Sequence, residues 1–164
     1  MPKYKYVLFD LDGTITNPKE GITKSVAYAL KHFGIDVENL DDLCKFIGPP
    51  LTDSFEQFYG FSHEKAIEGV KKYREYFSIN GLFENEKYEG IDKLFEELKK
   101  AGIHIALATS KPTVFAKQIL DHFGLTRYFD FIAGSELDGT RVKKGDVIAY
   151  ALENLKIKDK SSVI

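Results

Sequence analysis

Tyr6-Val-Leu-Phe-Asp-Leu-Asp-Gly-Thr14 is the stretch that decides the fold. Its first four residues form an apolar run typical of a buried strand, and the Asp-Leu-Asp-Gly that follows ends that strand in a polar turn. Two later runs have the same form. Ile103–Ala108 leads into Thr109-Ser-Lys-Pro112, and Phe129–Ala133 leads into Gly134-Ser. The sequence therefore predicts three short buried strands, each followed by polar residues.

Helical patterns fill the rest of the chain and alternate with strands only in its second half. Alternation predicts an α/β fold with a parallel sheet and helices on both faces. Four consecutive helical segments after the first strand are too many for a single crossover. We therefore expect residues 16–82 to form an inserted all-helical subdomain, and residues 1–15 and 83–164 to form the α/β core. The expected helices lie at about 21–33, 40–47, 51–59, 63–79, 91–101, 113–123 and 145–155.

The composition excludes several classes of protein. Hydrophobic residues make up 43% and charged residues 29%, which is typical of a globular domain, and a net charge of −2 predicts no nucleic-acid partner. The single Cys44 excludes an internal disulfide framework and a cysteine-rich zinc site. No apolar run has the length of a membrane span or resembles a signal region. We expect a cytoplasmic monomer or weak dimer without a membrane partner.

Polar residues at the ends of the three strands predict a functional site. Ligands of open parallel sheets bind at the carboxyl ends of the strands, so these residues should meet. They supply carboxylates, hydroxyls and cations, which are the groups expected around a phosphoryl group and a divalent ion. The candidates are Asp10, Asp12, Thr109, Ser110, Arg141, Lys143 and Lys144.

Each candidate also has a purely structural interpretation. The Asp-Gly pair can simply form a turn, although the spacing of an EF-hand calcium loop is missing. Thr109 and Ser110 can cap the helix that begins near Pro112, a role compatible with phosphate binding. Of the two adjacent lysines we favour Lys144, because of its position at a helix start. His104 is expected to be a packed core residue.

Asp10-Leu-Asp-Gly-Thr14 resembles the first signature of haloacid dehalogenase superfamily phosphatases. Thr109 resembles the second signature, and Lys144 ahead of Asp146-Val-Ile148 resembles the third. Gly48-Pro-Pro-Leu51 and the Thr109-Ser-Lys-Pro stretch are similar to the phosphoglycolate phosphatase branch. The resemblance implies a Rossmann-like core with an inserted helical cap.

The same resemblance places the family's fourth motif, which carries magnesium-binding acids, just after Ile164. Residues 160–164 read as the start of a fourth strand, so the core is apparently truncated after its third strand-helix unit and we expect the natural polypeptide to continue. A further acidic metal ligand is expected beyond Ile164. A chain ended at Ile164 is expected to have little activity.

The resemblance also implies a function. This would be a Mg²⁺-dependent phosphatase that hydrolyses a small phosphate monoester, phosphoglycolate-like or a nucleoside monophosphate, through an aspartyl-phosphate. Asp10 would be the nucleophile and a metal ligand, and Asp12 would be the acid/base and bind metal through its main-chain carbonyl. Thr109, Ser110 and Lys144 would bind phosphate. The alternatives are a sugar phosphomutase on the same scaffold, a phospho-Asp receiver-type signalling domain and an inactive fragment.

Overall fold

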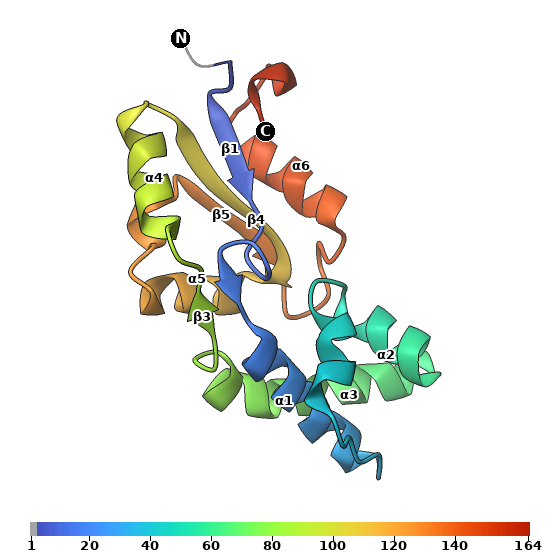
Figure 1. The fold of residues 1–164 in the computed structure, drawn as a ribbon. Coiled ribbons are helices and arrows are strands. Elements are labelled where there is room, and N and C mark those ends of the chain that lie inside the picture. The colour runs from blue at the N-terminus through green and yellow to red at the C-terminus, as the bar shows by residue number, and fades with distance from the viewer. Residues whose placement is uncertain (1–2) are drawn as a thin grey trace. The chain divides into compact units, whose positions relative to one another are not determined.

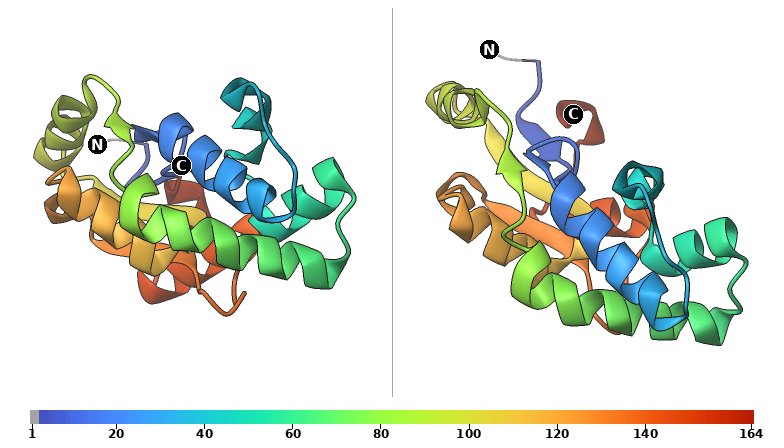
Figure 2. Two further views of the ribbon diagram at one scale, coloured as in Figure 1. Left: turned by 90° about the horizontal axis from the view of Figure 1, so that it is seen from below. Right: turned by 60° about the horizontal axis from the view of Figure 1, so that its bottom comes forward.

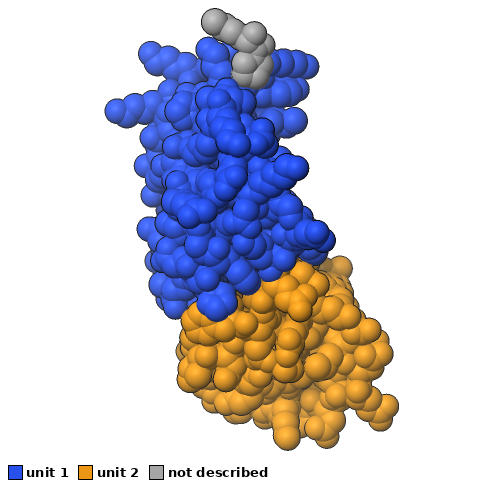
Figure 3. All heavy atoms as spheres, turned by 60° about the vertical axis from the view of Figure 1, so that its left-hand side comes forward, with its two compact units in different colours: residues 1–16, 87–164 blue, residues 17–86 orange. Residues whose placement is uncertain are grey.

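The computed structural model describes residues 3–164, which form two compact units (Figure 3). Unit 1 contains the chain up to Thr16 together with Lys87–Ile164, and unit 2 is Asn17–Glu86. The insert was expected to end at residue 82, but the segment that follows still packs within unit 2. There the carbonyl of Glu84 accepts a hydrogen bond from the Gly21 amide, at 2.9 Å.

Unit 1 is built on a parallel sheet of three strands (Figure 1). The strands are β1 (Tyr6–Phe9), β4 (His104–Pro112) and β5 (Phe131–Ser135), in the order β1-β4-β5. Phe9 of β1 is in register with Leu107, which is in register with Ile132 of β5. The carboxyl ends of the three strands therefore lie at one edge of the sheet.

The chain end runs beside the free side of β1, but it forms less strand than the sequence predicts. Lys160–Ser162 is a short 3-10 turn (η4), in which the Asp159 carboxylate accepts from the Ser161 amide at 3.0 Å. Only Val163 then pairs with Tyr6, as an isolated parallel bridge. The local Asp-Lys-Ser-Ser turn thus takes the place of the first residues of the expected strand.

Three α-helices cover the two faces of this sheet. They are α4 (Ile91–Lys100), α5 (Thr113–His122) and α6 (Lys144–Asn154), with a short 3-10 turn η3 (Thr126–Tyr128) before β5. α4 and α5 lie on one side of the sheet and α6 on the other (Figures 1 and 2). This is the arrangement that right-handed crossovers produce when the strand order reverses.

The two faces are packed differently. On the α4 side, Phe95 is fully buried, with its ring 5.1 Å from Phe9, 5.5 Å from Tyr128 and 5.3 Å from Phe129. Under α6 the buried side chains are small, and they allow that helix to approach the sheet closely. They are Ala108, Ala133, Val147 and Ala151.

Unit 2 is helical, as the sequence predicts. Its elements are α1 (Lys19–His32), a 3-10 helix η1 (Leu40–Phe46), α2 (Leu51–Tyr59), α3 (His63–Tyr76) and a π-helical turn η2 (Phe77–Gly81). Two short strands, β2 (Thr16–Asn17) and β3 (Glu86–Lys87), pair where the chain enters and leaves it. Among residues 3–164, no helix is long and apolar enough to cross a membrane.

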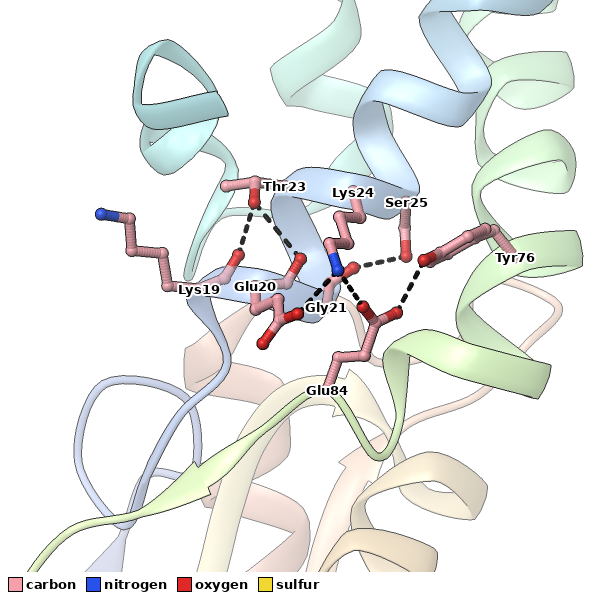
Figure 4. A network of polar contacts seen from close by, with 8 residues as sticks. All are labelled: Lys19, Glu20, Gly21, Thr23, Lys24, Ser25, Tyr76 and Glu84. Carbon is pink, nitrogen blue, oxygen red and sulfur yellow. Dashed lines mark hydrogen bonds and ion pairs between the residues drawn. The ribbon is translucent and has the colours of Figure 1, made fainter. Parts of the chain in front are cut away.

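A polar network joins the start of α1 to the segment that ends unit 2 (Figure 4). The Lys24 ammonium binds the carboxylates of Glu20 and Glu84, each at 2.6 Å, and the Tyr76 hydroxyl donates to Glu84 at 2.8 Å. Burial would by itself raise the pKa of Glu84, but Lys24 and Tyr76 outweigh it and lower that pKa. Unit 2 is thus closed at its own two ends by charged hydrogen bonds.

Candidate active site

The two aspartates of the N-terminal motif follow β1 in a tight loop. Leu11, between them, is fully buried, and its carbonyl accepts hydrogen bonds from the amides of Thr14, Ile15 and Thr16 at 2.9 to 3.2 Å. Gly13 has φ = +78°, a left-handed conformation that glycine adopts at little cost. The buried leucine and this turn hold Asp10 and Asp12 at the carboxyl end of the sheet.

The end of β4 is irregular at the same edge. Its register against β5 shifts between Ala108 and Pro112, so Thr109, Ser110 and Lys111 lie in a bulge. Thr109 is 2% exposed, and its hydroxyl accepts a hydrogen bond from the Lys111 amide at 3.2 Å. Bulges redirect side chains beside functional sites, and this one directs Lys111 toward the loop after β1.

Lys144, the first residue of α6, reaches the end of β1. Its ammonium lies 2.7 Å from the Asp10 carboxylate and donates to the Ala108 carbonyl, also at 2.7 Å. Lys143, by contrast, precedes the helix and is exposed. The structure therefore brings Lys144, rather than its neighbour, together with Asp10.

A second ion pair lies deeper in the same site. The ammonium of Lys111 is 3.0 Å from Oδ2 of Asp12, and the two side chains are only 6% and 12% exposed. Sequence reasoning treated Lys111 as part of a family signature and gave it no role. The available signal was a lysine three residues after a predicted buried strand, because lysine is seldom buried unless it is paired.

The remaining candidates have different surroundings. The Ser110 carbonyl accepts from the Ser135 hydroxyl at 2.8 Å, which ties the bulge to the end of β5. Arg141 has its guanidinium 3.9 Å from the Tyr150 ring centre and pairs with Glu136. Arg141 is thus engaged by Glu136 at the start of its loop and by Tyr150 of α6, whereas the lysines contact the two aspartates.

The site offers oxygen ligands for a hard cation. Asp10 supplies a carboxylate and Asp12 a main-chain carbonyl, while the Asp12 carboxylate pairs with Lys111 and its Oδ1 is buried without a hydrogen-bond partner. Among the residues that the structure describes, no group of three His, Cys, Asp or Glu could hold a metal. Mg²⁺ commonly binds through one or two carboxylates and keeps several waters, so this donor set fits it.

The chain is similar to proteins of known name. Residues 7–164 match the family described as "Haloacid dehalogenase-like hydrolase". A 5'-nucleotidase of Pseudomonas aeruginosa is 50% identical over 93% of this chain and 69% of its own length. Tyrosine-protein kinase PtkA of Mycobacterium tuberculosis is 40% identical, over 92% of this chain and 51% of its own. The crystal structure of a predicted phosphatase from Clostridium acetobutylicum superposes with a TM-score of 0.96 at 55% identity, over 98% of this chain and 74% of that one.

Proposed function

Because the chain belongs to the haloacid dehalogenase-like hydrolases, we propose that it hydrolyses a small-molecule phosphate monoester through an aspartyl-phosphate on Asp10. The observation that carries this proposal is the position of the Lys144 ammonium, 2.7 Å from the Asp10 carboxylate at the end of β1. A cation there stabilises the negative charge of a phosphoryl group as Asp10 attacks it. The predicted phosphatase and 5'-nucleotidase among its relatives support a phosphate-ester substrate.

The mechanism divides a slow reaction into two displacements. Asp10 attacks phosphorus, the bond to the leaving oxygen breaks, and Asp12 donates a proton to that oxygen. In the second displacement Asp12 takes a proton from water, whose oxygen attacks phosphorus and frees Asp10. Barriers to uncatalysed hydrolysis of phosphate monoesters are so high that enzymes lower them by about 20 kcal/mol or more.

Thr109 and Ser110 are proposed to bind the phosphoryl oxygens. They lie in the bulge just before α5, and a helix N-terminus favours anions through its free amides and its dipole. The Lys144 ammonium donates to the carbonyl of Ala108, the residue directly before Thr109. The three groups would therefore enclose one phosphate.

We propose Mg²⁺ as the cofactor, held by the Asp10 carboxylate and the main-chain carbonyl of Asp12. When bound, the ion would neutralise charge on the phosphoryl oxygens. A further acidic ligand, of the kind that the family's fourth motif carries, remains a prediction.

The substrate is proposed to be a nucleoside monophosphate or a phosphoglycolate-like acid. The name of the Pseudomonas relative supports the first of these. Unit 2 is proposed to act as the cap that covers the substrate. We also propose that the protein is cytoplasmic, is a monomer or weak dimer, and needs neither nucleic acid nor membrane.

The test is phosphate release from 4-nitrophenyl phosphate by the longest natural form of this protein, with and without Mg²⁺. Asp10→Asn should abolish Mg²⁺-dependent turnover, while Asp121→Asn, an exposed aspartate on α5, should leave it unchanged. A sugar phosphate isomer in place of free phosphate would favour the mutase. A stable phosphoprotein without turnover would favour the receiver, and no turnover by folded protein would refute the phosphatase.

A further inference from the structure

We propose that Lys111 is a positioning residue for Asp12, a role that rests on the proposed function. The pair is 3.0 Å apart, and both side chains are largely shielded from water. Exposed ion pairs contribute little, but a shielded pair with one partner removed leaves an uncompensated charge. The orientation of the Asp12 carboxylate therefore depends on the position of the Lys111 ammonium.

The backbone that carries Lys111 is held from several sides. Its amide donates to the Thr109 hydroxyl at 3.2 Å, and the carbonyl of Ser110 accepts from Ser135 at 2.8 Å. On β5, a Cβ atom added to Gly134 would lie 2.5 Å from the Lys111 carbonyl oxygen, so the two strands are in close contact there. These contacts fix the backbone of the bulge, from which the Lys111 side chain extends to Asp12.

The pairing treats the two oxygens of Asp12 differently. Oδ2 is held by Lys111, whereas Oδ1 is buried and has no hydrogen-bond partner. A carboxylate fixed at one oxygen presents the other in a defined direction. Lys111 therefore acts through Asp12 rather than on phosphate, where Lys144 already lies beside Asp10.

If Lys111 positions Asp12, the loss of kcat on replacing Lys111 should depend on the leaving group. A purely structural role of Lys111 predicts no such dependence. 4-Nitrophenolate leaves without a proton, but an alkoxide needs one, and general acid catalysis contributes about 100-fold or more. Lys111→Met in the longest natural form should therefore lower kcat for glycerol 2-phosphate at least about 10-fold more than kcat for 4-nitrophenyl phosphate. KM should change little. Lys117→Met, an exposed lysine on α5, is the matched control and should match wild type on both esters.

A double-mutant cycle separates action through Asp12 from a direct contact. The burst of 4-nitrophenol in a single turnover reports phosphorylation of Asp10. In an Asp12→Asn background, adding Lys111→Met should slow this burst no further, because the residue through which Lys111 acts is already gone. A further slowing would show that Lys111 contacts the phosphoryl group itself and would overturn the proposal.

Lys111→Arg is the control for loss of activity through misfolding, because it keeps the positive charge in a side chain of different shape. It should melt near the wild-type temperature and show a smaller loss, still selective for the alkyl ester. Equal losses on both esters in folded variants would overturn the positioning role while leaving the phosphatase intact. No turnover of either ester by the wild-type protein would instead refute the proposed function, and this inference with it.

Discussion

Replacing Gly134 by alanine tests whether β5 holds the bulge that carries Lys111. The new Cβ would lie 2.5 Å from the Lys111 carbonyl oxygen and 2.9 Å from the amide nitrogen and the hydroxyl of Thr113. Ordinary contacts begin near 3.4 Å, so the closest approach is about 0.9 Å too short. Two of these three atoms belong to the backbone, and β5 and β4 must separate to accommodate the methyl group.

Overpacking of this kind costs about 1–3 kcal/mol. For a chain of this length a loss of 2 kcal/mol lowers Tm by about 4–8 °C. Separation of the strands would also displace Lys111 from Asp12, so kcat for an alkyl phosphate should fall more than kcat for an aryl phosphate. Thermal unfolding followed by circular dichroism, with both assays on the same preparation, measures the two effects.

Gly145→Ala is the matched control for this substitution. Apart from its chain neighbours and the nearby backbone of its own helix, no atom lies within 4 Å of the position of its Cβ. Gly145 lies in α6, where alanine is favoured over glycine by about 0.5–1 kcal/mol. We expect Gly145→Ala to melt at or above the wild-type temperature. If Gly134→Ala is as stable as Gly145→Ala, the close approach of β5 to the bulge does not constrain the site, and this reasoning is wrong.

Two further substitutions test the fold outside the site. Gly21→Ala in α1 would place a Cβ 2.1 Å from the Gly81 carbonyl oxygen, so it should destabilise the protein by about 2 kcal/mol or more. Urea unfolding measures this loss, and an unchanged midpoint would contradict the close packing of Gly21 on Gly81. Asp130→Asn tests a titrating group: burial raises the pKa of Asp130, but Lys99, the Ile105 amide and His104 together hold it below its ordinary value of 3.8. The ionised Asp130 carboxylate therefore stabilises the protein above pH 3.8, and this stabilisation is lost as the pH falls through the pKa of the folded state. The difference in free energy of unfolding between wild type and Asp130→Asn should then become smaller in acid. A difference that became larger would refute the assignment.

The strongest periodic patterns predicted the fold most accurately. The strand Tyr6–Phe9 and the helix Leu51–Tyr59 have the predicted bounds, because apolar runs and turn residues define both ends locally. The segment 40–47 was expected to be an ordinary helix and is a 3-10 helix, capped by the side chain of Asn39 on the Asp41 amide. Hydrophobic periodicity does not distinguish these two helix types over so few residues.

The site was harder to predict where it depends on irregular backbone. Position at the ends of strands was enough to expect Asp10, Thr109 and Lys144 at one edge of the sheet. The sequence signal at Lys111 placed it near the site but did not indicate its direction, because that direction depends on a bulge in the pairing of β4 with β5. His104 was expected in the core, yet it is exposed, stacks on Tyr6 and pairs with Asp130. It is the first residue of its strand, where alternation no longer implies burial.

The closure of unit 2 at its own ends has a consequence for folding kinetics. Pairing of β1 with β4 joins residues that are far apart in the chain, and closing such a loop costs more entropy the longer it is. The Gly21 amide bonds to the Glu84 carbonyl, so a unit 2 that folded first would bring the two ends of the insert together before the sheet formed. The residues of unit 2 would then add little to the length of the loop that must close when β1 pairs with β4. This closure favours an order of folding in which the helices of unit 2 form first and the sheet of unit 1 second. The sheet would then form at the rate of a protein with fewer contacts between distant residues.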